Sequence, residues 1–171
     1  MPPEPAPVAA ERELVLSRDI DLPRERLFRA WTERLADWWA PRPLTTPVCQ
    51  AEVRAGGRLH TVMRAPDGRE FSCGGVFLEV VPNERIVFTD AYRAGWQPNP
   101  DIFFTAIVTF EPLAGERTRY TARALHWTAE ARDRHYAMGF HQGWAQCLDQ
   151  LVELAAELTP SRPRETASLS S

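Results

Sequence analysis

The chain has 171 residues, 44% of them hydrophobic, a size that suits one domain with a substantial core. Its 20 basic residues are all arginine and face 23 acidic ones, a balance that argues against nucleic acid as the main partner. No apolar run reaches the ~18 residues of a membrane-spanning helix, so no membrane span is expected. The absence of lysine excludes mechanisms that need a Schiff-base or phosphate-loop lysine.

The cysteines and the chain ends indicate a reduced, cytoplasmic protein. Cys49, Cys73 and Cys147 are odd in number and form no CxxC pair, which favours free thiols over a disulfide framework. The N-terminus lacks the basic start and apolar stretch of a signal peptide. Residues 1–10 and 159–171, rich in proline or serine, are predicted to be disordered tails flanking a single domain over residues 11–158.

The first predicted elements are a strand and two short helices. Residues 13–21 broadly alternate apolar and polar side chains, which predicts a strand. Pro23 suits the first position of a helix, because its missing N–H costs little there. The apolar stripe of that helix includes Trp31, and residues 34–39 predict a second short helix that ends before Pro41.

From residue 48 the period changes to two, and six strands separated by turns are predicted. They cover residues 48–54, 58–64, 70–81, 85–92, 102–113 and 117–126. Short strands with hairpin-length connections predict an antiparallel meander. Gly74 and Gly75 are expected to form a bulge in the third of these strands. The loop 93–101, which carries Trp96, is a candidate lid over a pocket.

Residues 130–158 predict one long helix with a continuous apolar face. Gly139 and Gly143 lie inside it, each costing about 1 kcal/mol relative to alanine. They could permit close approach to the sheet, or they could leave space for a ligand beside Phe140 and Trp144. Because one helix does not cover a six- or seven-stranded sheet tightly, a sheet that curls around it would enclose a pocket.

A series of short motifs occurs in a fixed order along this framework. The motifs occupy residues 28–32, 38–41, 54–58, 66–68, 79–85, 88–89, 118–120, 143–144 and 148–151. Their order and spacing resemble the START-like SRPBCC superfamily, and more narrowly the branch related to the C-terminal domain of the activator of heat-shock-chaperone ATPase. The resemblance covers residues 14–158. Ala55 departs from it, because proline commonly precedes the glycine pair there.

The resemblance implies an α+β helix-grip fold (START/Bet v-like). In this fold a curved antiparallel sheet of six or seven strands wraps around a long C-terminal helix, two short helices follow the first strand, and a cavity lies between sheet and helix. Some members of this superfamily bind lipids or other hydrophobic molecules, some are cyclases or related enzymes, and many bacterial members have no known activity. Fold alone therefore does not decide function.

Three functions follow as hypotheses. The first is binding of a small hydrophobic or aromatic ligand between sheet and helix. The second is a cyclase- or hydrolase-like enzyme acting on a polyketide-like or aromatic substrate in the same cavity. The third, a chaperone-activator-like partner protein, is least favoured because the sequence shows no long exposed apolar stretch. A homodimer could form through an edge strand or the tryptophan-rich second helix.

Pockets for organic ligands are mainly apolar with a few polar groups. We expect the polar groups here to be Asp90, Tyr92, Tyr120 and His141. Asp90, in phase with Phe88, is expected to point inward and to pair with an arginine such as Arg123 or Arg64, with general acid–base chemistry as the alternative. The full set of candidate ligand-binding residues is Trp31, Trp39, Met63, Phe88, Asp90, Tyr92, Phe104, Val108, Tyr120, Phe140, His141 and Trp144.

No catalytic signature of the common hydrolase, metalloprotease or nucleotide-binding classes is present. His135 and His141 lie six residues apart, which is about 600° around a regular helix, so they would point to different faces. Adding Asp133 or Cys147 produces no tight metal spacing. No metal or cofactor is expected, and the histidines, His126 included, are predicted to be satisfied or exposed.

Overall fold

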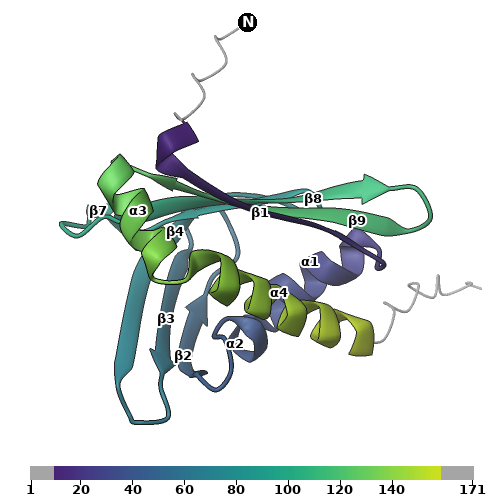
Figure 1. The fold of residues 1–171 in the computed structure, drawn as a ribbon, viewed down its shortest axis with the longest axis horizontal. Coiled ribbons are helices and arrows are strands. Elements are labelled where there is room, and N and C mark those ends of the chain that lie inside the picture. The colour runs from purple at the N-terminus through teal and green to yellow at the C-terminus, as the bar shows by residue number, and fades with distance from the viewer. Residues whose placement is uncertain (1–9, 159–171) are drawn as a thin grey trace, which may run out of the picture.

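The computed structural model describes residues 10–158. The disorder expected for residues 1–9 and 159–171 lies outside the described residues. Ala10, which was assigned to the N-terminal tail, belongs to a short 3-10 helix, η1 (Ala10–Arg12). The predicted fold class is confirmed: an antiparallel sheet curls around helices on one of its sides, with two short helices after the first strand (Figure 1).

Seven antiparallel strands form the sheet, in the spatial order β1-β9-β8-β5-β4-β3-β2. The strands are β1 (Glu13–Ile20), β2 (Thr45–Ala51), β3 (Arg58–Arg64), β4 (Glu70–Val81), β5 (Arg85–Thr89), β8 (Phe104–Leu113) and β9 (Arg117–His126). The C-terminal ends of two predicted strands, 48–54 and 85–92, were misplaced, because β2 ends at Ala51 and β5 ends at Thr89. A separate hairpin, β6 (Tyr92–Arg93) and β7 (Gln97–Pro98), follows β5.

The long strand β4 carries the curl of the sheet. The N-terminal half of β4 pairs with β3, and its C-terminal half pairs with β5. Figure 1 shows β2, β3 and the N-terminal half of β4 turned away from the plane of β1, β8 and β9. The bulge predicted at Gly74–Gly75 is misplaced, because the register shifts between Phe77 and Glu79. Gly75 serves close approach instead: a Cβ there would lie 2.1 Å from the Thr89 carbonyl oxygen.

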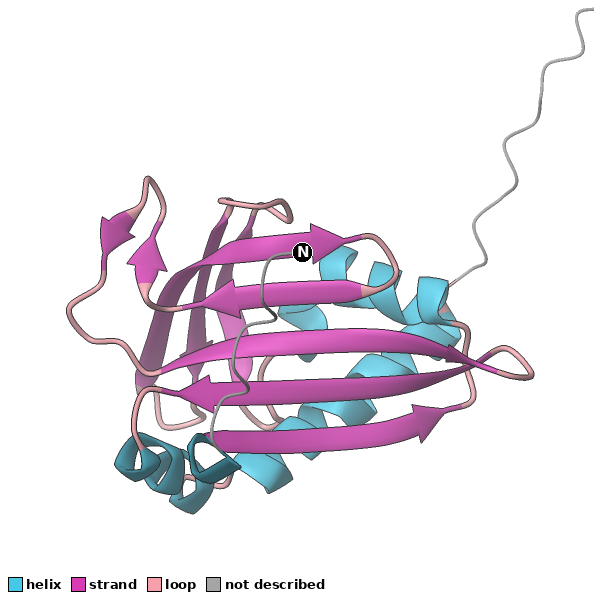
Figure 2. Cartoon of the chain, turned by 90° about the horizontal axis from the view of Figure 1, so that it is seen from above, coloured by secondary structure: helices cyan, strands magenta, loops and turns pink. Residues whose placement is uncertain are grey.

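Residues 10–158 also form four α-helices: α1 (Arg24–Glu33), α2 (Leu35–Trp38), α3 (Ala129–Ala137) and α4 (Phe140–Glu157). Seen from above in Figure 2, α1, α2 and α4 lie beneath the sheet, and α3 lies at one edge. The predicted long C-terminal helix is present as α4, but its predicted start at residue 130 was wrong. Gly139, with a φ of 90°, separates α3 from α4. Glycine adopts this left-handed conformation without the steric strain that a side chain would cause.

The core lies between the inner face of the sheet and α1, α2 and α4. Trp31, Phe77 and Phe110 are its largest fully buried side chains. The inner face of β8 and β9 carries small residues, Ala106 and Ala122, and these leave room for the helices to approach. This burial of apolar surface provides the main driving force for folding.

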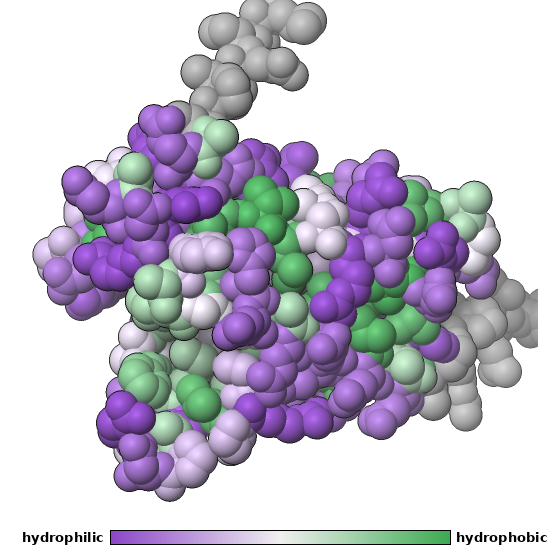
Figure 3. Space-filling model, viewed as in Figure 1, coloured by the Kyte–Doolittle hydropathy of each residue, from purple (hydrophilic) through white to green (hydrophobic). Residues whose placement is uncertain are grey.

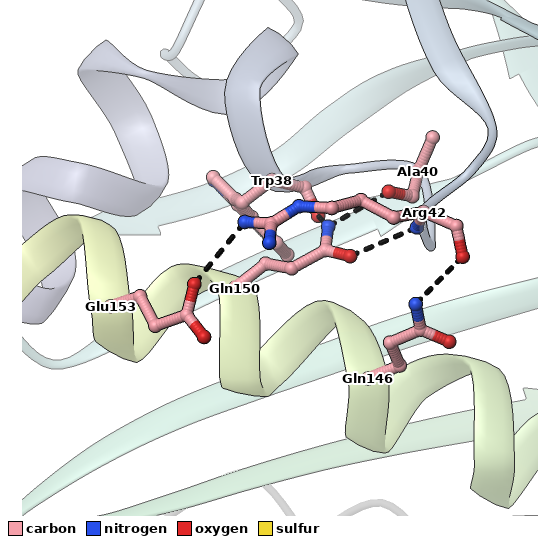
Figure 4. A network of polar contacts seen from close by, with 6 residues as sticks. All are labelled: Trp38, Ala40, Arg42, Gln146, Gln150 and Glu153. Atoms are coloured by element: carbon pink, nitrogen blue, oxygen red, sulfur yellow. Dashed lines mark hydrogen bonds and ion pairs between the residues drawn. The ribbon is translucent and has the colours of Figure 1, made fainter.

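A polar clamp fastens α4 to the segment that follows α2 (Figure 4). The buried Gln150 side chain donates to the carbonyl oxygens of Trp38 (3.3 Å) and Ala40 (2.8 Å) and accepts from the Arg42 N–H (2.9 Å). Gln146 adds a bond to the Arg42 carbonyl oxygen, at 2.8 Å. One buried amide therefore satisfies three backbone groups that the α2 segment leaves without helical partners.

Candidate functional site

A continuous row of aromatic rings follows the inner side of the sheet toward α4. The centroid of Trp39 lies 5.7 Å from that of Phe88, and Phe88 lies 6.3 Å from Phe104. Phe104 in turn lies 5.8 Å from Trp144, which packs 4.5 Å from Phe140. These separations are typical of stacked or edge-to-face pairs. The five residues, called the aromatic row below, were all predicted as ligand-binding.

The aromatic row is not sealed. Trp39, Phe104 and Trp144 are only partly buried, whereas Trp31, which packs under Phe88 at 6.0 Å, is 1% exposed. On α4, a Cβ added to Gly143 would meet no atom within 4 Å. The close-approach interpretation of Gly143 is therefore wrong, and this part of α4 adjoins open space.

Three other predicted residues lie elsewhere on the inner face. Val108 is 2% exposed and Tyr120 is 4% exposed, both in the core, and burial raises the pKa of Tyr120 far above its ordinary value. Met63, on β3, is partly buried and pairs across the strands with Phe71, which is 45% exposed. Figure 3 shows apolar surface at this free end of β3 and β4.

The four predicted polar groups do not converge. Tyr120 packs against Phe110, with 5.4 Å between ring centroids, while Tyr92 is 39% exposed and packs against Trp96 in the β6–β7 hairpin. His141 is exposed and lies beside Tyr136. Asp90 lies at the end of β5. This dispersion does not favour the enzyme hypothesis, which required these groups in one cavity.

Asp90 is bound by backbone, not by an arginine. Its carboxylate accepts the N–H groups of Phe103 (2.9 Å) and Phe104 (3.3 Å), where β8 begins. The expected partners are engaged elsewhere: Arg123 pairs with Glu13, and Arg64 with Glu70. The pairing of β5 with β8 ends next to this point, at Thr89 and Thr105. The Asp90 carboxylate therefore accepts hydrogen bonds from N–H groups that have no partner in the neighbouring strand. Burial raises the pKa of Asp90, and these hydrogen bonds oppose the shift.

Sequence reasoning missed a buried histidine pair next to the aromatic row. His126, at the end of β9, has its Nε2 2.8 Å from Nδ1 of His135 on α3. The Nδ1 of His126 lies 2.9 Å from the Arg12 carbonyl oxygen, which only accepts, so this Nδ1 donates. His126 Nε2 is then the acceptor, and His135 must donate from Nδ1. The one ring nitrogen of the two histidines that still carries a free lone pair is therefore His135 Nε2.

The surroundings keep both imidazoles neutral. His135 is 7% exposed, and its ring lies 4.8 Å from Phe103 and 5.1 Å from both Phe104 and Phe140. Burial, and then the neighbouring His126, lower the pKa of His135 to about 4. Burial also lowers the pKa of His126. His135 Nε2 has no hydrogen-bond partner among the described residues, yet it is not sealed from solvent.

A signal for this pair was present in the sequence. Thr128 is a good N-cap, and its hydroxyl accepts from the Ala131 N–H at 3.1 Å, which starts α3 just after β9. A helix that begins so soon after a strand can fold His135 back over His126. Counting faces from His135 to His141 assumed an unbroken helix, which Gly139 rules out.

The family model described as "Activator of Hsp90 ATPase homolog 1-like protein" matches residues 21–156. The chain belongs to this family. No curated protein matches it.

Solved structures of bacterial proteins share the fold. A protein from Nitrosomonas europaea is 36% identical with a TM-score of 0.82, over 87% of this chain and 97% of its own. A protein from Chromobacterium violaceum is 27% identical with a TM-score of 0.68, over 83% and 96% of the two chains. An AHSA1 protein from Silicibacter pomeroyi is 25% identical with a TM-score of 0.63, over 85% and 99%.

Two absences hold for the described residues of this family member. Residues 10–158 contain no group of three or more histidine, cysteine or acidic side chains placed to hold a metal ion. None of the helices described is long and apolar enough to cross a membrane.

A second feature lies on the opposite face of the sheet. Gln50, His60 and Gly74 are cross-strand partners on β2, β3 and β4, so they share a face. Their neighbours in the ladder, Ala51 and Leu59, point into the core. The outer face of these three strands and the β6–β7 hairpin together line a pocket of about 590 Å³, called the outer pocket below.

The lining of the outer pocket is polar. It consists of Gln50, Arg58, His60, Ser72, Cys73, Gly74, Gly75, Asp90, Arg93, Ala94, Asn99 and Asp101. The loop 93–101, predicted as a lid over the gap between sheet and helix, lies instead at this outer pocket. Its Trp96 packs toward Gly56, where an added Cβ would be 3.3 Å from the indole. Short-range sequence pattern carries no information about which face a hairpin covers.

Proposed function

We propose that this protein binds a small hydrophobic or aromatic molecule against the aromatic row, between the sheet and α4. The observation that supports this is the partial exposure of Trp39, Phe104 and Trp144 within an otherwise buried ring cluster. Aromatic faces left partly open on a concave surface are the usual lining of sites for organic ligands. The open space at Gly143 is the proposed point of entry.

The histidine pair supplies the polar group of the proposed site. His135 packs among the rings of Phe104, Phe140 and Trp144, at 5.1, 5.1 and 6.0 Å. Its Nε2 carries an unused lone pair and, with a pKa of about 4, stays neutral at pH 7. A neutral imidazole nitrogen accepts a hydrogen bond, so the preferred ligand is an aromatic or hydrophobic molecule with one donor, such as a phenolic hydroxyl.

The test compares 2-naphthol with 2-methoxynaphthalene, which has the same ring and no donor. We expect both to bind, as followed by tryptophan fluorescence and native mass spectrometry, with 2-naphthol about tenfold tighter. The variant Gly143→Leu fills the entry and should abolish binding of both. Ala156→Leu adds the same bulk at an exposed position of α4 and should leave binding unchanged.

The outcomes separate two claims. If neither compound binds, or if Gly143→Leu binds as well as the parent protein, the proposed site is wrong. If both bind equally, the site stands and the role of His135 Nε2 is wrong. Stoichiometric recovery of a chaperone from lysate, with no ligand binding, would favour the partner-protein hypothesis instead.

A further inference from the structure

Most arginines in residues 10–158 pair with an acidic side chain, and the arginines of the outer pocket belong to the minority that do not. Thirteen of the arginines in residues 10–158 form an ion pair with an acidic side chain. Arg58 and Arg93, which both line the outer pocket, are not among them. Among the described residues, the guanidinium of Arg93 makes one hydrogen bond, a long one of 3.5 Å to the Asn99 amide oxygen. Two arginines thus line one concavity without an ion pair among the described residues.

Neither of the two carboxylates of the outer pocket forms an ion pair with Arg58 or Arg93. The oxygens of Asp90 accept the backbone N–H groups of Phe103 and Phe104. Asp101 is exposed, and among the described residues its carboxylate makes no ion pair.

Other donors surround the same space. Ser72 lies with its hydroxyl 3.3 Å from Nε2 of His60, and the Gln50 side chain has no hydrogen bond among the described residues. Asn99 holds the hairpin: its amide donates to the Asp90 carbonyl oxygen at 2.8 Å, and its oxygen accepts from the Asp101 N–H at 3.2 Å. This network keeps the segment that carries Arg93 against the sheet, so the donors are in place before any ligand arrives.

From this arrangement we propose that the outer pocket binds a small oxyanion, a carboxylate or a phosphate, between Arg58 and Arg93. The planar guanidinium presents its N–H donors in a fork that matches both groups, and charge-assisted bonds of this kind are strong. A volume of about 590 Å³ lies within the usual range for a small-molecule site. This site is on the other face of the sheet from the aromatic row and does not depend on it.

The test uses inorganic phosphate and succinate as separate probes, each at an ionic strength held constant with sodium chloride. Binding is followed by calorimetry and by the ring resonances of His60. We expect saturable binding of at least one probe, weakened about tenfold or more by Arg58→Gln and by Arg93→Gln. Arg26→Gln, on α1, removes an arginine that also lacks an ion pair and should leave the affinity unchanged.

The result assigns the anion and can overturn the site. Binding of phosphate alone or succinate alone identifies the oxyanion class. Because Arg93 lies on an exposed hairpin, Arg93→Gln should retain the parent's unfolding midpoint, which separates loss of a ligand contact from loss of the fold. The proposal is wrong if neither probe gives saturable binding, or if Arg93→Gln and Arg26→Gln bind alike. Neither outcome changes the naphthol experiment.

Discussion

The two ends of α4 differ in burial and in role. From Leu148 onward, Leu148, Leu151 and Ala155 are at most 2% exposed, and the clamp residue Gln150 is 5% exposed. In the N-terminal half, Trp144 is only partly buried and Gly143 adjoins open space. The same helix therefore anchors the fold at one end and forms the wall of the proposed ligand site at the other. Substitutions should separate the two roles.

The largest effect is expected in the apolar part of the anchor. Leu151→Ala removes a fully buried side chain and should lower the free energy of unfolding by about 2–5 kcal/mol. Urea denaturation measures the loss. Leu154→Ala, at a partly buried position on the same helix, should cost clearly less. Equal losses at the two positions would contradict the division of α4.

Removing the polar clamp should cause the second-largest loss in the free energy of unfolding. Gln150→Leu leaves the Trp38 and Ala40 carbonyl oxygens and the Arg42 N–H without partners, and we expect a loss of about 2–3 kcal/mol. Gln146→Leu removes one exposed bond and serves as the matched control. A stable Gln150→Leu protein would show that packing alone holds α4 to the α2 segment.

Acid should destabilise the fold through His135, which lies on α3 next to the N-terminal end of α4. Its folded-state pKa of about 4 lies below the unfolded value of 6.5, so the unfolded chain binds a proton that the fold excludes. Stability present at pH 7 is lost as the pH falls from 6.5 toward 4, by about 2 kcal/mol between pH 7 and 5.

Chemical denaturation at the two pH values measures this effect. His135→Phe keeps an aromatic ring among Phe103 and Phe104 and should remove most of the pH dependence. His141→Phe, at an exposed position, should retain it. A parent protein equally stable at both pH values would contradict the depressed pKa.

The two glycines should give small effects of opposite sign. Gly143→Ala adds a better helix former next to open space and should stabilise the protein by up to about 1 kcal/mol. Gly139→Ala must adopt a φ of 90° and should destabilise it by about 1–2 kcal/mol. Thermal unfolding of both variants checks the signs. Stabilisation by Gly139→Ala would mean that α3 and α4 can join.

Local pattern predicted most of the framework. The ranges of β3, β4 and β9 agree with the prediction, because alternation and strong turn signals occur within a few residues of each strand. The break at Gly139 was missed, since glycine within an apolar helical period is ambiguous between an interior and a terminal position. Phe88 and Phe104 of the proposed site were predicted because they are in phase with the inner face of the sheet.

The polar part of both sites could not be predicted in this way. His126 and His135 meet because β9, the cap at Thr128 and the break at Gly139 fold one over the other. Asp90 satisfies backbone donors that exist only where the β5–β8 ladder opens. The periods of two and 3.6 in the sequence determined the strands, the helices and their apolar faces. Only the tertiary structure decided which polar groups meet and which face the hairpin covers, because both depend on how the sheet curls.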